Sequence, residues 1–198
     1  RKEIKMEPSQ EKTSSKLKTK QLVMICIMSA LLCIIGPLSI PIGPIPVSLT
    51  LLGVYLAVYT LGTKDGTYAF IIYLLLGLVG LPVFSGFTGG PAKLFGPTGG
   101  YLLGMIFLSL ISGWFINHFD SKHFPMHLLG MILGLMSCYI PGTIWFMILT
   151  KVSFMEGFAT CVFPFLVFDA IKIIIAAILG ITLRKALKAS HLCEYKKL

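Results

Sequence analysis

The sequence predicts an all-α polytopic membrane protein, a bundle of six transmembrane helices with a long outward glycine-rich loop between the third and fourth helices. Composition, the length of the apolar runs and the distribution of basic residues lead to this prediction. The chain of 198 residues is 56% hydrophobic and only 13% charged, whereas an ordinary soluble domain is about 25% charged. Apolar runs long enough to cross a bilayer recur along almost the whole chain after Gln21.

Six candidate spans emerge from a window of about 20 residues. They cover residues 21–40, 47–61, 67–81, 99–117, 127–150 and 159–183. Between the first two lies the segment IPIGPIP, whose three prolines exclude a continuous helix. The pair Gly36-Pro37 should bend the first span or end it early.

The two ends of the chain are polar. Residues 1–20, RKEIKMEPSQEKTSSKLKTK, are mixed in charge and are expected to be disordered or to form a short surface helix. Their charged region is too long for a cleaved signal peptide. The expected organisation is a polar cytoplasmic segment at residues 1–20, a membrane domain at residues 21–188 and a cytoplasmic tail at residues 189–198.

The basic residues predict the orientation of the bundle. Seven of the 17 lysines and arginines precede residue 21, and five lie at or after Arg184. Both ends are therefore expected on the cytoplasmic side, which requires an even number of spans. With six spans, two further lysines fall in cytoplasmic loops, only Lys93 and Lys151 face outward, and Lys172 is left in the membrane. The net charge of +9 does not indicate nucleic-acid binding, because no folded aqueous domain could present it.

Neither the five cysteines nor the four histidines indicate a metal site. The cysteines make no metal-ligand spacing and no obvious disulfide pair, and the histidines cluster near the predicted cytoplasmic ends. No metal and no other cofactor is therefore expected.

One pair of opposite charges lies inside the last predicted span, in the stretch PFLVFDAIKIIIAAILG. Asp169 and Lys172 are three residues apart, so they share one helix face, and each would cost roughly 2.5–3.5 kcal/mol at a helix centre. We expect Asp169 about ten residues, or roughly 15 Å, from the outer end of the helix. The pair could be an internal ion pair that only stabilises the bundle, but a buried ion pair seldom stabilises a protein more than apolar residues at the same positions would. A ligand with donors and acceptors explains the pair better, because the carboxylate accepts from N–H groups and the ammonium donates to a carbonyl.

The segment GLPVFSGFTGGPAKLFGPTGGY, residues 80–101, lies outside in this topology. Its glycines and three prolines exclude one regular helix. Phe84, Phe87 and Phe95 are unusual for a merely solvated loop, so we expect a re-entrant or lid-like loop over the bundle, acting as an ordered cap or as a ligand lid. It is not a phosphate loop, because it lacks Gly-Lys-Ser/Thr. As a lid it would offer Lys93 to an anionic group of the ligand.

The same loop resembles the signature of the BioY proteins, the biotin-binding S components of energy-coupling factor (ECF) vitamin transporters. Three more segments resemble that family: IPIGPIPVSLTLLGV after the first span, YIPGTIW in the fifth, and FDAIK in the last, which is similar to a Gly-Asp-x-x-Lys element. Together they cover nearly all of residues 22–188. The resemblance implies a six-helix bundle in a bacterial or archaeal plasma membrane that binds biotin from outside. It also implies partnership with a transmembrane coupling protein and two ATP-binding-cassette ATPases.

A set of substrate-binding residues is implied by the same resemblance. Asp169 and Lys172 match the polar pair expected to hold the ureido ring, whose two N–H donors and one carbonyl suit them, and Tyr139 matches an aromatic near that ring. The lid adds Phe84, Ser85, Gly86 and Phe87, and the segment after the first span adds Ser48 and Thr50. For the site of the ligand carboxylate, Lys93 and the backbone amides of Gly99 and Gly100 are alternatives. Two positions depart from the family pattern. Phe168 stands where a glycine is common and should crowd the pair, and Thr50 stands where many members carry a glutamine.

The leading interpretation is a subunit that binds biotin, delivers it for ATP-driven uptake and has no catalytic activity of its own. Because the chain has no Walker motif, ATP hydrolysis would come from the partners. An ion- or proton-coupled secondary transporter with Asp169 as the relay is the alternative, although the sequence shows no convincing inverted repeat and Lys172 would hinder the cycling of Asp169. An intramembrane enzyme would need a nucleophile with a base at depth, and the spans hold neither.

Overall fold

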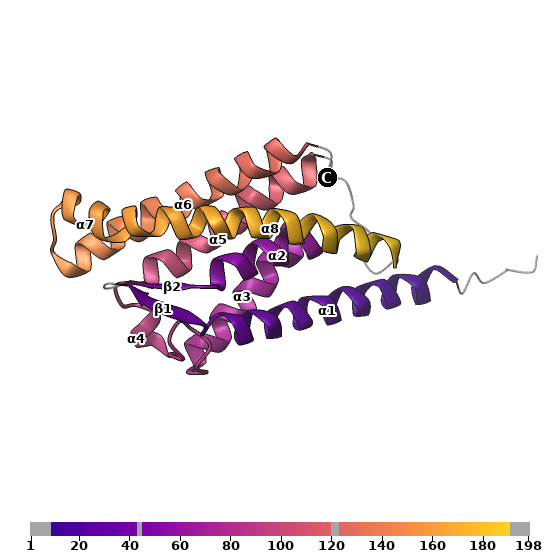
Figure 1. Ribbon diagram of the computed structural model, residues 1–198. Coiled ribbons are helices and arrows are strands. Elements are labelled where there is room, and N and C mark those ends of the chain that lie inside the picture. The colour runs from indigo at the N-terminus through magenta and orange to yellow at the C-terminus, as the bar shows by residue number, and fades with distance from the viewer. Residues whose placement is uncertain (1–8, 43–44, 120–122, 191–198) are drawn as a thin grey trace, which may run out of the picture.

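The computed structural model describes residues 9–42, 45–119 and 123–190, and these are mostly helical (Figure 1). In this part of the chain six helices have twelve or more residues: α1 (Ser9–Ile35), α2 (Thr50–Leu61), α3 (Thr63–Val79), α5 (Gly99–His118), α6 (Phe124–Thr150) and α8 (Phe163–Ala189). The remaining elements are two short helices, α4 (Pro91–Leu94) and α7 (Phe154–Cys161), and two strands, β1 (Ser39–Ile42) and β2 (Ile45–Ser48).

Three helical segments of the described residues are long and apolar enough to cross a membrane. They are α5, α6 and the segment Phe154–Leu187, which contains α7 and most of α8; Thr19–Ile35 and α2 are shorter apolar helices. On α6, the side chains of Ile140, Ile144 and Ile148 are exposed at four-residue spacing. Such a stripe on one helix face is apolar surface of the kind that contacts lipid. The chain is therefore a membrane protein.

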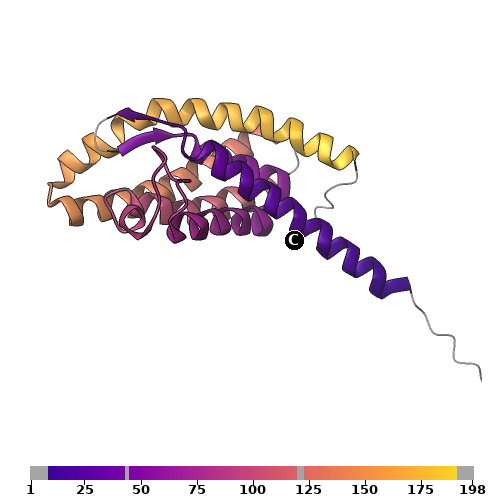
Figure 2. The same cartoon turned by 90° about the horizontal axis from the view of Figure 1, so that it is seen from below.

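Helix α1 extends further toward the N-terminus than the predicted first span. It begins at Ser9, so residues 9–20 continue the helix and are neither a disordered segment nor a separate surface helix. In Figures 1 and 2 these turns extend past the other helices. The helix ends at Ile35, which confirms the predicted break at Gly36-Pro37. Residues 1–8 and most of the predicted tail, residues 191–198, lie outside the described residues.

The proline-rich segment after α1 forms an antiparallel β-hairpin. The sequence excluded a continuous helix here but did not predict strands. Pro41 of β1 is paired with Pro46 of β2, and a two-stranded sheet tolerates proline because each strand has a free edge. Since the hairpin continues to Ser48, α2 begins at Thr50 and is shorter than the predicted span 47–61.

Glycines allow α5 and α6 to approach closely. A Cβ atom on Gly104 would lie 3.0 Å from the carbonyl oxygen of Cys138, and one on Gly134 would lie 3.0 Å from that of Leu108. Small residues at such contacts let two membrane helices pack backbone to backbone. Helices α2 and α3 pack against α5, and α7 and α8 pack against α6.

The last predicted span is divided into two helices. The side chain of Ser153 accepts a hydrogen bond from the backbone of Glu156, and the carboxylate of Glu156 accepts one from the backbone of Ser153, so a capping box starts α7. Helix α8 then begins at Phe163. Asp169 therefore lies only six residues, or about 9 Å, from the start of its helix. The expected ten residues were counted from residue 159, which lies in α7 and not in α8.

Candidate ligand-binding site

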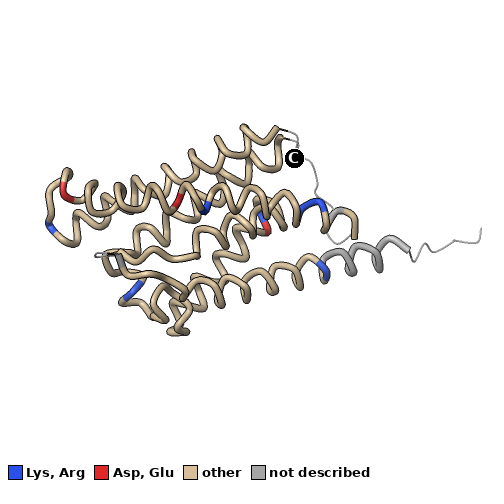
Figure 3. Tube along the Cα trace, viewed as in Figure 1, with Lys and Arg blue, Asp and Glu red and all other residues tan. Residues whose placement is uncertain are grey.

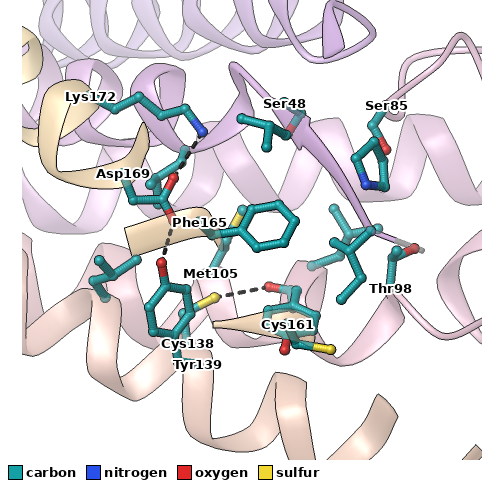
Figure 4. A pocket seen from close by; sticks show the side chains of 17 residues that line it. Ser48, Ser85, Thr98, Met105, Cys138, Tyr139, Cys161, Phe165, Asp169 and Lys172 are labelled. Carbon is teal, nitrogen blue, oxygen red and sulfur yellow. Dashed lines mark hydrogen bonds and ion pairs between the residues drawn. The ribbon is translucent and has the colours of Figure 1, made fainter. Parts of the chain in front are cut away.

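Two buried side chains of α8 and one of α6 form a polar cluster. Lys172 Nζ donates a hydrogen bond to Asp169 Oδ1 at 2.9 Å, and Tyr139 Oη donates one to Asp169 Oδ2 at 2.5 Å. Figure 4 shows the two donors approaching the carboxylate from different sides. All three side chains are buried. Both carboxylate oxygens thus have a donor within the protein.

This cluster lies against a pocket whose other walls are largely apolar. Its lining comes from β2, α2, the segment between α3 and α5, and the helices α5, α6, α7 and α8. It consists of Ile45, Pro46, Val47, Ser48, Leu51, Ser85, Thr98, Tyr101, Leu102, Met105, Leu135, Cys138, Tyr139, Cys161, Phe165, Asp169 and Lys172. In Figure 4 the hydroxyl-bearing residues Ser85 and Thr98 lie across the pocket from Asp169. The pocket therefore offers charge at one end, weaker polar groups at the other and apolar walls between.

The pocket lies at the end of the bundle where the β-hairpin, α4 and α7 are found, called here the hairpin end (Figure 1). Along the described chain, charged residues gather toward the two ends of the bundle, and the ion pair of α8 stands apart from them (Figure 3). The pocket has about 80 Å³ open to the centres of water-sized spheres. One water needs only about 10–15 Å³ on this measure, so the cavity is large enough to be hydrated.

The electrostatics of the cluster favour a neutral group of a ligand that both donates and accepts hydrogen bonds. Asp169 and Lys172 cancel in charge, and removal of one partner from a buried ion pair costs about 3–5 kcal/mol. The ammonium of Lys172 has three N–H donors, and a carboxylate can accept more than one bond at each oxygen. A ligand can therefore add hydrogen bonds to both groups without breaking the pair. Among the described residues no group of three or more His, Cys, Asp or Glu could hold a metal ion.

Comparison with known proteins places the chain in a family. The family model described as "BioY family" matches residues 9–189. The chain belongs to the BioY family. Its sequence is 35% identical over 174 residues to the "Biotin transporter BioY2" of Lactococcus lactis subsp. cremoris, with 88% of this chain and 94% of that protein covered. It is 37% identical over 169 residues to the "Biotin transporter BioY" of Thermotoga maritima, with 84% and 96% covered.

A solved structure of similar fold is described as the "S-component for biotin from an ECF-type ABC transporter". The two structures superpose with a TM-score of 0.79 at 30% sequence identity, covering 91% of this chain and 95% of the other. The two relatives are named for transport and not for catalysis. This agrees with the expectation that this BioY chain is not an enzyme.

Five of the twelve residues that the sequence pointed to line the pocket. They are Asp169, Lys172, Tyr139, Ser48 and Ser85. They come from α8, α6, β2 and the loop after α3, so residues far apart in the BioY sequence meet at one cavity.

The other seven do not line the pocket: Phe84, Gly86, Phe87, Lys93, Gly99, Gly100 and Thr50. Thr50 instead accepts a hydrogen bond from Ser48 Oγ at 3.1 Å, and its hydroxyl lies 3.4 Å from the carbonyl oxygen of Gly36. Gly100 packs against α6, where an added Cβ would lie 2.4 Å from Cβ of Trp145. Phe168, expected to crowd the ion pair, is 37% exposed and is not part of the pocket lining.

The aromatic residues of the glycine-rich loop do not all pack inward. Phe84 is fully buried against Gly77, where an added Cβ would lie 2.1 Å from Cζ of its ring, whereas Phe87 and Phe95 are exposed. Phe87 also has a positive φ of 56°, a conformation that costs free energy in a residue other than glycine. The sequence alone could not distinguish these phenylalanines.

Backbone hydrogen bonds hold the glycine-rich loop at several points. The N–H of Gly86 donates to Pro37 O at 3.0 Å, and that of Gly90 donates to Gly77 O at 2.7 Å. At the other end of the loop, Trp145 Nε1 donates to Gly96 O at 3.0 Å. The short helix α4 lies between these anchors, and burial lowers the pKa of Lys93 in that helix.

Sequence reasoning missed most of the apolar wall of the pocket. Phe165 lies four residues before Asp169 and seven before Lys172, so helical spacing could have placed it on the same face. Likewise Leu135 lies four residues before Tyr139. The residues of β2 had no such signal, because the hairpin itself was not predicted.

Proposed function

We propose that this chain is the substrate-binding membrane subunit of a biotin uptake system, binds biotin in the pocket at the hairpin end, and delivers it for ATP-driven transport. The observation that carries the proposal is the buried cluster of Asp169, Lys172 and Tyr139 at one end of an otherwise apolar pocket. Membership of the BioY family supports it, as do the names of the relatives and of the similar structure. No observation favours the secondary transporter.

Biotin matches the pocket group by group. Its ureido carbonyl would accept from Lys172 Nζ, and a ureido N–H would donate to the carboxylate of Asp169, so that both new bonds are charge-assisted. The thiophane ring and the aliphatic tail suit the apolar wall that Phe165 and Met105 provide. The ligand carboxylate would then point away from α8, toward the side of Ser85 and Thr98 (Figure 4).

The residues that hold the ligand carboxylate belong to the loop region. Lys93 and the backbone amides of Gly99 and Gly100 are the candidates, although none lines the pocket in this structure. Gly99 and Gly100 begin α5, where the first amides of a helix attract anions. In this structure the N–H of Gly99 donates to Gly96 O at 2.9 Å, so it would have to leave that bond to hold the ligand. Movement of the loop that contains Phe84, Ser85, Gly86 and Phe87 would bring Lys93 toward the ligand and close the lid.

The topology that fits this function has six spans with both termini in the cytoplasm and the hairpin end outside. Helices α6 and α8 have 27 residues each, or about 40 Å, enough for a hydrocarbon core of about 30 Å. Helix α2 has only 12 residues, about 18 Å, so the hairpin would complete the second crossing. Residues 1–20 and 189–198 would flank the membrane domain on the cytoplasmic side of the plasma membrane, and biotin would enter from outside.

Transport needs partners in this proposal. The chain has no nucleotide-binding loop, so a transmembrane coupling protein and two ATP-binding-cassette ATPases would supply the energy. The description of the similar structure as part of an ECF-type ABC transporter supports this assembly.

Calorimetric titration of the purified protein with biotin, beside an Asp169→Asn variant, tests the proposal. Loss of a hydrogen bond to a charged group costs about 1.5–3 kcal/mol, so we expect roughly 10- to 150-fold weaker binding. Asp65→Asn is the matched control, because Asp65 is an exposed carboxylate that bonds to Gln21 and does not line the pocket. Absence of binding by folded wild-type protein would refute biotin as the ligand, and full binding by the Asp169 variant would move the ureido site elsewhere.

A further inference from the structure

Helix α7 presents an apolar face that the described part of the chain does not cover. The side chains of Phe154 and Met155 are 64% and 72% exposed, and that of Phe158 is 44% exposed. The rings of Phe154 and Phe158 stack with their centroids 6.3 Å apart. Large contiguous apolar patches are unfavourable in water, so this face must be covered by something apolar.

Two residues of α7 belong to the protein interior. Gly157 and Cys161, four residues apart, are buried. A Cβ on Gly157 would lie 2.7 Å from Cγ of Met147, so α7 lies directly on α6, and Cys161 lines the pocket. The helix therefore reaches the pocket through Cys161 at its end, while Phe154, Met155 and Phe158 stay exposed.

The start of α7 is polar. Lys151, which ends α6 with a positive φ of 58°, is exposed, and so are Ser153 and Glu156 of the capping box. Hydrogen bonds to Ser153 lower the pKa of the Glu156 carboxyl. Eight residues span only about 12 Å, so α7 cannot cross the membrane by itself. Since α8 alone is long enough to cross, α7 is not needed as part of the last span.

We propose that α7 is an interfacial helix, with Phe154, Met155 and Phe158 in the boundary between lipid head groups and acyl chains at the hairpin end. Helix α8 follows α7 directly, and its residues Phe163 and Val167 are exposed as well. Interfacial helices bury one apolar face about 5–10 Å into this boundary and keep polar groups toward water. Helix α7 has both features, because its capping box is polar and its phenylalanines form an apolar face.

This lipid contact also holds one wall of the pocket in place, a consequence that rests on the proposed function. Cys161 is held in place by the packing of α7 on α6 and by the contact of α7 with the interface. If the apolar face lost its lipid contact, α7 would be held mainly through Gly157, and the Cys161 wall would loosen. The lipid leaflet is then part of what shapes the ligand site.

Depth-dependent fluorescence quenching in bilayers tests the placement without any ligand. Phe158→Trp and Ile140→Trp are compared after subtraction of the wild-type emission of Trp114 and Trp145. Ile140 is the matched control, because it is exposed on α6 ten residues, or about 15 Å, from the end of that helix. We expect lipids brominated near the head-group end of the acyl chain to quench the added tryptophan at 158 more than lipids brominated near the chain end, and the reverse at 140.

Two outcomes would overturn the proposal. Quenching of the tryptophan at 158 by aqueous acrylamide and by neither lipid would place α7 in water. The same depth profile at 158 as at 140 would make α7 part of the span.

A second arm, the Phe154→Ser/Phe158→Ser double variant, should bind biotin several-fold more weakly than wild type in bilayers; normal affinity would refute the link to the pocket. Absence of wild-type binding with the expected quenching would instead refute biotin as the ligand and leave the interfacial helix intact.

Discussion

The buried charges of α8 lie in two places that differ in what surrounds them. Asp169 and Lys172 line the pocket. Arg184 lies about 22 Å beyond Asp169 along the helix, where it is buried in protein. Arg184 Nη1 donates to the carbonyl oxygen of Ile116 at 2.6 Å, and Nη2 lies 3.4 Å from Oδ1 of Asn117. The guanidinium of Arg184 therefore bonds to acceptors within the protein, whereas the Asp169–Lys172 pair faces a cavity.

The surroundings of Arg184 explain why a charge there does not indicate a ligand. Ile116 and Asn117 are in the last turn of α5, whose carbonyls lack partners within the helix and attract cations. Asn117 Nδ2 in turn donates to Thr63 Oγ1 at 2.9 Å, which ties α5 to the start of α3. A buried charge that donates hydrogen bonds to the free carbonyls at a helix end has a structural role. A buried pair that borders an open pocket has hydrogen-bonding capacity left for a ligand.

Replacement of both pocket charges should separate binding from stability most strongly. In the Asp169→Leu/Lys172→Leu variant we expect biotin binding to be lost, because no group remains for the ureido ring. Folding should be unaffected or improved, since apolar replacement of a buried pair is often neutral or stabilising by about 1–4 kcal/mol. Calorimetry and thermal unfolding in the same detergent measure the two effects. A large fall in unfolding temperature with binding retained would give the pair the structural role that the sequence left open.

Arg184→Met should show the opposite pattern. It leaves buried carbonyls of α5 without their donor, and an unsatisfied buried group costs about 1–3 kcal/mol. We expect a lower unfolding temperature and an unchanged dissociation constant for biotin in the fraction that is folded. Lys185→Met, next in the chain and exposed, is the control. Weakened biotin binding at full stability would show that the two charged sites are coupled.

Tyr139→Phe tests how the carboxylate of Asp169 is oriented. The substitution removes the hydroxyl that donates to Oδ2 but keeps the ring in the pocket wall. We expect biotin binding to weaken by about 1 kcal/mol, roughly fivefold, because the carboxylate loses one of its two fixed donors. Titration calorimetry of this variant beside Tyr101→Phe compares it with a second pocket tyrosine, whose hydroxyl bonds to Thr143. Equal losses in both would indicate general loosening of the pocket.

The same contrast explains what sequence could and could not predict. Asp169 and Lys172 were found because charge inside an apolar run is rare and costly. Arg184 was counted only as a basic residue at the cytoplasmic end, since its partners Ile116 and Asn117 are distant in sequence. The helices followed from apolar runs, but their ends did not: a break at Val162 divides the span predicted over residues 159–183 into α7 and α8.

The direction of each side chain in the glycine-rich loop could not be predicted from the sequence either. Phe84, Phe87 and Lys93 all lie in one glycine-rich segment, yet only Phe84 packs into the core, because Gly77 on α3 leaves room for its ring. Side-chain direction in such a loop depends on φ values and on long-range backbone bonds, such as that from Gly86 to Pro37. Neither is visible in a linear sequence.

The smallest expected effect concerns Lys93 and the pH dependence of binding. If Lys93 holds the biotin carboxylate, only its protonated form attracts the anion, and burial lowers its pKa from the ordinary value of 10.5. Affinity should therefore be fully present below this lowered pKa and should fall as pH rises through it, before a lysine of ordinary pKa would lose its proton. Lys93→Arg should retain affinity to higher pH, because arginine stays charged. Calorimetric titration with biotin over a pH series measures this, with Lys151→Arg as the control. Identical pH profiles for the wild type and Lys93→Arg would assign the carboxylate to the amides at the start of α5, which do not titrate.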